Sequence, residues 1–440
     1  MKLEMPWGSE TVTVNIPDTW KIVKPTNTGA GFTSDSRDEA AIVRDALAAP
    51  YAANPISSND LAGKKIVIVV EDNTRPSPVY KYFSLILDEL VAAGALLSDV
   101  LVISSLGIHT AMTEEEMAAK IGAENLARVS WENHDAFDDD LNVSFGTTSN
   151  GTPVSLNKNL MTAGFIILLG TLEPHIFAGF GGGMKAILPG VASKDTIGTH
   201  HQLLTEPADQ FNRVGMDADD NPFRLDLEET RDMIGAPIFI VNTVLDSGNI
   251  AAAFAGDPIA AHRAGCELIS TSESLHFSRQ VDAIICNSSP MDVNFKQGFK
   301  CVGNSLPVLK SNGAVMGFIK ADKGLDDIPL PDKLGIPLWL LKIALRLLGP
   351  SLVFTLVKLV KSDASVEELF LYYYTMQVCR EYDLFLYVPT LTEDEAEAML
   401  YFEWFEDPQK VIDRVIWKVG FFATVAVFPH GAATYAVVDS

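Results

Sequence analysis

The sequence predicts an α/β protein made of two α/β domains with mainly parallel sheets, and two observations support this prediction. First, three short segments, 65–70, 100–105 and 165–169, are continuously apolar and rich in β-branched residues. This pattern is typical of strands that are buried on both faces of a sheet. Second, each segment runs into a polar loop, and at least two of these loops lead into helical segments. Such an alternation of strand and helix is typical of a parallel sheet.

The other elements of the first domain follow from local patterns. Alternating polar and apolar side chains predict a strand at residues 10–16. Thr113 and Glu116 form a capping-box pattern, which predicts that a helix begins there. The remaining expected elements are helices at 35–48, 79–93 and 259–273 and a strand at 236–244.

A second α/β unit is expected after a linker within residues 271–279. Its strands are expected at 281–286, 314–319 and 383–388, and 290–301 would be its first loop. These boundaries give an N-terminal domain of residues 1–270 and a C-terminal domain of residues 280–424, with the active-site cleft between them. The tail, residues 425–440, is expected to form a hairpin-like pair of strands, and its pattern leaves open to which domain they return.

The composition indicates a soluble globular protein, because 48% of the 440 residues are hydrophobic and 20% are charged. The net charge of −24, without a Lys/Arg cluster, argues against nucleic-acid binding. The four cysteines are far apart and form no CxxC pair, so neither a zinc or iron–sulfur site nor a disulfide framework is expected. The N-terminus lacks the apolar region of a signal peptide, so we expect a cytoplasmic protein.

Residues 335–361 are the most apolar stretch of the chain. Their longest uncharged run, 347–357, is shorter than the roughly 20 residues that a helix needs to span a bilayer. Gly349 and Pro350 divide the stretch into two expected helices that pack on a domain or on a partner subunit. Because all the charges in the stretch are basic, helices on a membrane surface are the alternative.

Polar side chains that could carry chemistry follow each of the three buried strands. Asp72 and Arg75 follow the first, His109 follows the second, and His175 and Lys185 follow the third. In parallel α/β sheets, ligands bind outside the carboxyl ends of the strands. We therefore expect these three loops to converge on one crevice.

The third loop has five glycines in the twelve residues 179–190. Glycine lets the backbone approach a ligand or adopt positive φ, although a plain structural turn is the alternative. Lys185 is followed by Ala186 rather than Ser or Thr, so the loop is not a nucleotide-hydrolysing P-loop. The glycine spacing does not match a dinucleotide fingerprint either.

Four of the eight histidines fall on loops at this expected sheet edge: His109, His175, His200 and His201. Histidine can act as a general base near neutral pH or as a metal ligand. Their spacing matches no HExxH zinc motif. A metal held by only one of them would need its other ligands from a cofactor.

Three further side chains are candidates for binding anions or closing the cleft. Arg75 could hold a carboxylate or a phosphate through two parallel hydrogen bonds, and the alternative is a structural ion pair with Asp72. Gln297 and Lys300 are three residues apart in an early helical turn of the second domain, so they share a face. That face would point at the cleft between the domains.

Taken together, these residues resemble the lactate racemase family, the nickel-pincer-nucleotide-dependent 2-hydroxyacid racemases and epimerases. The order and spacing of the motifs agree over most of the chain. The most specific part is the spacing of His175, Lys185 ten residues later and His201 sixteen residues after that. The matching segments are 72–76, 107–109, 173–185, 188–193 and 294–300.

The resemblance implies a cofactor and a role for each matching residue. Lys185 would carry a pyridinium-3-thioamide-5-thiocarboxylate mononucleotide covalently, and this group would hold nickel with His201 as the remaining ligand. His109 and His175 would be paired acid/bases that exchange the hydroxyl proton while the C2 hydride moves to the cofactor and returns. Cofactor-synthesis enzymes would be necessary partners. The implied cofactor-binding residues are Asp72, Asn73, Thr74, Arg75, Lys185, Gln297 and Lys300, and the implied substrate-contacting residues are Arg75, Lys296, Lys300 and Tyr374.

Three positions depart from the family pattern. Thr110 stands where members have Arg, Lys296 where they have an aromatic residue, and Tyr374 where they have Trp. All three would border the substrate, so malate, phenyllactate or a sugar acid are alternatives to lactate. A protein of another class, a non-catalytic nucleotide- or metabolite-binding protein on this scaffold, is the competing hypothesis. A homo-oligomer is compatible with the sequence.

Overall fold

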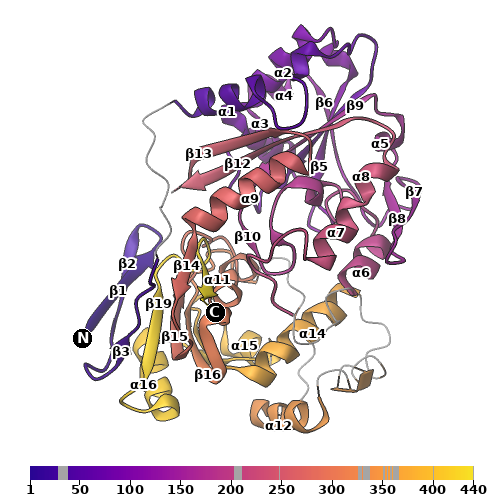
Figure 1. Ribbon diagram of the computed structural model, residues 1–440. Helices are drawn as coiled ribbons and strands as arrows, with labels where there is room; N and C mark the ends of the chain where they lie inside the picture. The colour runs from indigo at the N-terminus through magenta and orange to yellow at the C-terminus, as the bar shows by residue number, and fades with distance from the viewer. Residues whose placement is uncertain are drawn as a thin grey trace.

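Two six-stranded sheets form the centre of the computed structural model, one in the upper and one in the lower half of Figure 1. Adjacent strands are parallel in both sheets except for one pair, β12 and β13. The predicted α/β fold with mainly parallel sheets is therefore confirmed. The structure describes residues 1–27, 38–202, 211–246, 248–325, 330, 337–349, 352–353, 355–356, 359, 366–399 and 401–439.

The first sheet contains all three buried strands that the sequence predicts. They lie side by side at its centre, with β4 between β5 and β9. In sheet order the strands are β13 (Asn249–Gly256), β12 (Ile238–Asp246), β9 (Phe165–Thr171), β4 (Ile66–Glu71), β5 (Val100–Ser105) and β6 (Ser130–Asn133). Two small hairpins accompany it: β7 (Asn142–Thr147) with β8 (Pro153–Asn157), and β10 (Pro174–His175) with β11 (Gly179–Phe180).

Both faces of the first sheet are covered, which explains why its central strands lack polar positions. Ile66, Ile68 and Val70 of β4 belong to one hydrophobic cluster, and Val67 and Val69 belong to another on the opposite face. All five side chains are buried, and each such burial contributes about 1.5–3 kcal/mol. The helices of this unit are α1 (Glu39–Ala48), α2 (Phe83–Ala92), α3 (Glu114–Ile121), α4 (Ala123–Leu126), α5 (Asn159–Thr162), α6 (Lys194–Gln202), α7 (Pro222–Glu228), α8 (Thr230–Met233) and α9 (Ala260–Ser272).

The predicted capping box at the start of α3 is present. The Thr113 hydroxyl accepts a hydrogen bond from the Glu116 amide at 3.2 Å, and the Glu116 carboxylate accepts one from the Thr113 amide at 2.8 Å. The helix expected at 35–48 begins at Glu39, after the Asp38 cap, and residues 35–37 lie outside the described residues.

The second sheet contains the strands expected for the C-terminal domain. In sheet order they are β18 (Glu403–Phe405), β17 (Asp383–Tyr387), β16 (Leu309–Phe318), β15 (Val281–Asn287), β19 (Thr424–Phe428) and β3 (Lys21–Ile22). Its helices are α10 (Phe295–Gly298), α11 (Lys300–Ser305), α12 (Leu338–Leu348), α14 (Val366–Glu381), α15 (Glu393–Met399) and α16 (Pro408–Val419).

The two ends of the chain both lie with this second sheet, which differs from the expected boundaries. The hairpin β1 (Lys2–Trp7) and β2 (Glu10–Asn15) packs on it, because Met5 and Val14 share a hydrophobic cluster with Ile285. The N-terminal unit therefore begins after β3 rather than at residue 1. An alternating pattern such as that of β2 shows that one face is buried, but it does not show against which sheet.

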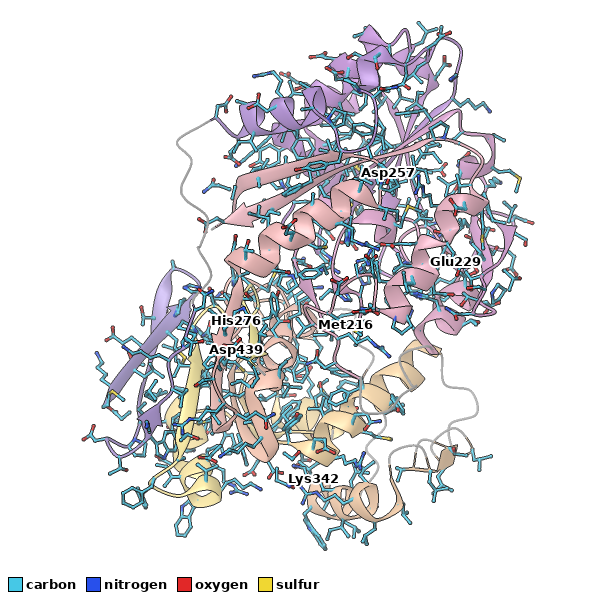
Figure 2. All side chains as sticks on the ribbon, in the orientation of Figure 1. Met216, Glu229, Asp257, His276, Lys342 and Asp439 are labelled. Carbon is cyan, nitrogen blue, oxygen red and sulfur yellow. The ribbon has the colours of Figure 1, made fainter. Side chains whose placement is uncertain are left out.

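The tail is not a hairpin either. Strand β19 lies between β15 and β3, whereas β20 (Tyr435–Val438) pairs in parallel with β14 (Ser274–Phe277) in the expected linker. Figure 2 shows His276 and Asp439 next to each other at this junction, where His276 Nδ1 lies 2.7 Å from Asp439 Oδ1. The tail thus fastens the connection between the two units.

The apolar stretch 335–361 forms α12, which packs on α14. The second helix expected there falls largely outside the described residues. Across the described ranges, no helix has both the length and the apolar character needed to cross a membrane.

Candidate active site

A cavity of about 680 Å³ lies between the two units, and all three predicted loops line it. The loop after β4 contributes Asp72 and Arg75, the loop after β5 contributes His109, and the segment after β9 contributes His175 and Lys185. The expected convergence of these loops at the carboxyl ends of the strands is confirmed. The far wall comes from the second unit and includes Phe295, Lys296, Phe299, Tyr374, Thr375, Met399 and Tyr401.

The glycine loop is held in a crowded position where side chains do not fit. Gly182 and Gly183 have φ values of +69° and +61°, which L-residues rarely adopt. A Cβ at Gly182 would lie 2.8 Å from Asn242 Oδ1, and a Cβ at Gly183 would lie 2.8 Å from the His262 ring. Asn242 Oδ1 also accepts a hydrogen bond from the Gly183 amide at 2.8 Å. The glycines therefore let the backbone lie directly on its supporting side chains.

Arg224, on α7, supports the same loop from inside the protein. Its side chain is fully buried and donates hydrogen bonds to the carbonyls of Ala178, Phe180 and Gly182. His262, on α9, contacts the Gly181 carbonyl through Nε2 at 2.9 Å. Carbonyls that would otherwise be buried without partners are satisfied in this way. These four contacts hold the loop that carries Lys185 in place.

His175 and Lys185 are in direct contact. His175 Nε2 lies 2.9 Å from Lys185 Nζ, and His175 Nδ1 accepts hydrogen bonds from the amides of Phe177 and Ala178, each at 3.2 Å. Burial and the neighbouring Lys185 amine lower the pKa of His175 well below its usual value. Burial and the charges of Arg75 and Arg224 likewise lower the pKa of Lys185 well below its usual value.

His109 has a different anchor. Its Nδ1 lies 2.6 Å from Asp72 Oδ2, while its Nε2 lies 3.4 Å from the Lys296 amine on the second unit. Asp72 also accepts hydrogen bonds from the amide and hydroxyl of Thr74. Burial alone would raise the pKa of Asp72, but the hydrogen bond and charge of His109 lower it to about 2. Asp72 is thus an anionic anchor that orients the His109 ring.

The paired histidines of α6 face different surroundings. His201 lines the cavity, and its Nδ1 lies 2.7 Å from the Ile197 carbonyl. A carbonyl can only accept, so Nδ1 carries the proton and Nε2 is the nitrogen that has the lone pair in the neutral ring. Burial and the charge of His200 lower the pKa of His201 to about 3. His200 is fully buried and contacts the Phe223 carbonyl at 2.9 Å, so its surroundings are those of a residue that stabilises the fold.

The two candidate carboxylate-binding cations meet at Glu173. The Glu173 carboxylate is 2.8 Å from Lys300 Nζ and also forms an ion pair with Arg75. Burial would raise the pKa of Glu173, but the charges of Lys300 and Arg75 lower it to about 2. The ion pair of Arg75 is with Glu173 rather than with Asp72, the structural partner that the sequence suggested. Glu173 ties Arg75 of the first unit to Lys300 of the second.

Of the other predicted residues, Tyr374 lines the cavity, whereas Asn73, Thr74, Gln297 and Lys300 are not among the residues that line it. Asn73 is exposed and donates to Glu116 at 2.6 Å, and Thr110 is exposed and outside the cavity lining. Gln297 is buried on α10, and its Oε1 has no hydrogen-bond partner among the described residues. Tyr374 lines the cavity, with its ring 5.5 Å from that of Phe177.

Several residues of the site were not singled out from the sequence. Glu71 lines the cavity and accepts hydrogen bonds from the Thr171 amide and hydroxyl, each at 3.0 Å. Burial raises the pKa of Glu71. The position of Glu71 at the end of a buried strand is the sequence feature that could have identified it as a site residue. Arg224 and His262 lie within ordinary amphipathic helices, where no pattern distinguishes them from surface residues.

Within the described ranges, no group of three or more His, Cys, Asp or Glu side chains is arranged to hold a metal ion. A metal bound at His201 would therefore need ligands that do not come from these protein side chains.

Comparison with known proteins gives consistent matches. The family profile of the lactate racemase N-terminal domain matches residues 7–212. The chain is 31% identical over 324 residues to a lactate racemase of Thermoanaerobacterium thermosaccharolyticum, covering 71% of this chain and 73% of that protein. It is 28% identical over 325 residues to a lactate racemase of Lactiplantibacillus plantarum, with the same coverage.

Solved structures show the same fold. The lactate racemase apoprotein from T. thermosaccharolyticum superposes with a TM-score of 0.82 at 24% identity, covering 100% of both chains. A structural-genomics protein from Thermotoga maritima superposes with a TM-score of 0.66 at 20% identity, covering 92% of this chain and 99% of that one.

Proposed function

The chain belongs to the lactate racemase family and is thus an isomerase, and we propose that it racemises or epimerises C2 of a 2-hydroxyacid with a nickel-pincer nucleotide tethered to Lys185. The observation that carries this proposal is the grouping of His109, His175, Lys185 and His201 around one cavity. Asp72 anchors His109, the Ile197 carbonyl anchors His201, and His175 and Lys185 contact each other.

The residues present fit the proposed cofactor. A lysine must be neutral to be acylated, and the surroundings of Lys185 favour its neutral form. The Ile197 carbonyl holds His201 in the tautomer whose Nε2 has the free lone pair, and metal-binding histidines typically donate their other ring N–H to a carbonyl or carboxylate in this way. Gly181, Gly182 and Gly183 line the cavity, where a flat group could lie against their backbone. Other metal ligands would have to come from the bound nucleotide.

When bound, this group would supply a hydride acceptor for the substrate C2. The side chains of the chain would bind, orient and exchange protons. Asp72 holds the His109 ring so that Nε2 faces the cavity, where it would take or return the hydroxyl proton. His175 would do the same for the other enantiomer. Arg75 and Lys300, which both form ion pairs with Glu173, would hold the substrate carboxylate.

Lactate is the simplest substrate for this proposal. The residues around Lys296 make two other classes of 2-hydroxyacid candidates as well. The Lys296 amine lies beside His109, so a substrate with a second carboxylate, as in malate, would meet a cation there. The aromatic residues Phe295, Phe299 and Tyr401 line the same wall, where an aromatic 2-hydroxyacid such as phenyllactate would pack.

The test is to produce the full chain in cells that also express cofactor-synthesis enzymes. We would measure the mass of the peptide containing Lys185, the bound nickel, and racemisation of lactate, malate, phenyllactate and sugar acids by chiral chromatography. We expect an adduct on Lys185, nickel and activity, each lost in Lys185→Ala. His109→Ala and His175→Ala should keep the adduct but lose activity. Unmodified Lys185 without nickel or racemisation would overturn the proposal and favour a non-catalytic binding protein.

A further inference from the structure

Glu173 places a carboxylate in the part of the cavity wall where the substrate carboxylate is expected to bind. It lies two residues before His175, and its side chain is only 12% exposed. Its Oε1 accepts a hydrogen bond from the Arg75 guanidinium and another from the Lys300 amine at 2.8 Å. Of these three side chains, Arg75 and Glu173 line the cavity, whereas Lys300 does not. A ligand at this point of the wall therefore meets a cation and an anion together.

The Glu173 carboxylate is fixed in this position and is ionised. Its backbone carbonyl accepts a hydrogen bond from the Gly181 amide at 2.7 Å, and Pro174 follows it in the short strand β10. A Cβ at Gly181 would lie 3.3 Å from Glu173 Cγ, so the side chain lies against the glycine loop. Although burial alone would raise the pKa of Glu173, the charges of Lys300 and Arg75 lower it to about 2. The wall thus carries a permanent negative charge near neutral pH.

A carboxylate beside an arginine can either orient the arginine or compete with a ligand for it. A carboxylate that only orients would lie behind the guanidinium, but Glu173 lines the cavity together with Arg75. Within the described ranges, Glu173 is the only side chain to which Arg75 donates, so the other N–H groups of the guanidinium are left for a ligand. Two carboxylates on one guanidinium repel each other. Because Coulomb energy falls only with the inverse of distance, this repulsion offsets much of the attraction.

We propose that Glu173 limits how tightly the site binds a carboxylate, by sharing Arg75 and Lys300 with the substrate. This inference rests on the proposed function for the identity of the ligand, a 2-hydroxyacid. A racemase must release both enantiomers, and binding that is equally strong in the ground state and the transition state does not raise kcat. Weak carboxylate binding suits such an enzyme. Glu173 is then a residue that sets the affinity of the site, and it takes no part in the proton transfers.

The experiment is isothermal titration calorimetry of lactate into the full chain produced without cofactor-synthesis enzymes. Glu173→Gln keeps the size of the side chain and an oxygen that accepts hydrogen bonds, but it removes the charge. We expect its Kd for lactate to be at least about tenfold lower than that of the wild type. Glu173→Asp keeps the charge and should bind lactate as weakly as the wild type does. Adding Arg75→Met to Glu173→Gln should abolish the gain, because the gain depends on Arg75.

Asp383→Asn is the matched control, with the same change in net charge. Asp383 is also a carboxylate shared by two cations, Lys342 and Lys418, and its side chain is 16% exposed. It belongs to the second unit and is outside the cavity lining, and its partner Lys342 is labelled in Figure 2. Asp383→Asn should therefore leave the Kd for lactate unchanged. A gain as large as that of Glu173→Gln would reduce the effect to one of net charge and overturn the proposal.

Weaker or unchanged lactate binding by Glu173→Gln, or binding by neither chain, would also overturn the proposal. Far-ultraviolet circular dichroism checks that each variant is folded. If Glu173→Gln does not fold, Lys300→Met is compared with the double variant Lys300→Met/Glu173→Gln, which should bind lactate more tightly than Lys300→Met alone. These measurements need neither nickel nor an adduct. Failure of the proposed function, seen as unmodified Lys185 without racemisation in cells that make the cofactor, is therefore a separate result.

Discussion

His175 Nε2 lies 2.9 Å from Lys185 Nζ, and the other contacts of His175 decide which atom carries the hydrogen between them. The amides of Phe177 and Ala178 both point at His175 Nδ1. A nitrogen that accepts two N–H donors has no proton, so the neutral ring carries its proton on Nε2. His175 is therefore the donor in this pair, and Lys185 accepts as a neutral amine.

We predict that Lys185 is the most readily acylated lysine of the unmodified chain near neutral pH. Burial and the charges of Arg75 and Arg224 lower the pKa of Lys185, so its nucleophilic form is already abundant where ordinary lysines, with a pKa near 10.4, are protonated. Trace labelling with acetic anhydride over a pH series, read by peptide mass spectrometry, measures this. A labelling profile for Lys185 that follows those of the surface lysines in the same sample would contradict the prediction.

We also predict that His175 is held as the Nε2–H tautomer in the chain without cofactor. Two-bond ¹H–¹⁵N spectra of histidine-labelled protein distinguish the two tautomers, and His175→Gln identifies the signal. Lys185→Met should leave the tautomer unchanged, because the backbone amides still point at Nδ1. Acylation of Lys185 turns its nitrogen into a donor, so the modified chain should show an altered His175 signal. An Nδ1–H tautomer in the unmodified chain would refute the assignment.

The sequence was sufficient to predict the three central strands of the first sheet and the meeting of the loops that follow them. Strands such as β4 are apolar at every position because both faces are covered, and the polar residues after them must lie at one edge. The location of the chain ends could not be predicted in this way. Strand β3 has two residues, and nothing in Lys21 or Ile22 indicates pairing with β19 four hundred residues later.

The candidate site was predictable where residue type and spacing were unusual, as for His175, Lys185 and His201. Their supports were not predictable, because they come from distant elements. Arg224 resembles a surface residue of an amphipathic helix, and only the fold brings its guanidinium to three carbonyls of the glycine loop. The partner of Arg75 likewise depends on the position of Glu173, 98 residues away.

Replacing Arg224 should be among the most destabilising single changes in the first unit. Arg224→Met would leave the buried carbonyls of Ala178, Phe180 and Gly182 without donors, and the expected cost is about 3–5 kcal/mol. Arg231→Met is the control, because Arg231 is 42% exposed and pairs with Asp257 at the surface, a contact usually worth less than about 1 kcal/mol. Urea denaturation compares the two variants. Equal losses would show that Arg224 does not hold the loop.

Stability should fall as the pH drops below the usual pKa of histidine. Burial lowers the pKa of His200 and of His201 to about 3, so between about 6.5 and 3 the unfolded chain binds protons that the folded chain does not. The free energy of unfolding then decreases with falling pH, by up to about 1.4 kcal/mol per pH unit for each histidine. His200→Gln keeps a donor for the Phe223 carbonyl but cannot be protonated, so it should flatten the slope of unfolding free energy against pH in urea titrations. A slope equal to that of the wild type would show that His200 is not buried in its neutral form.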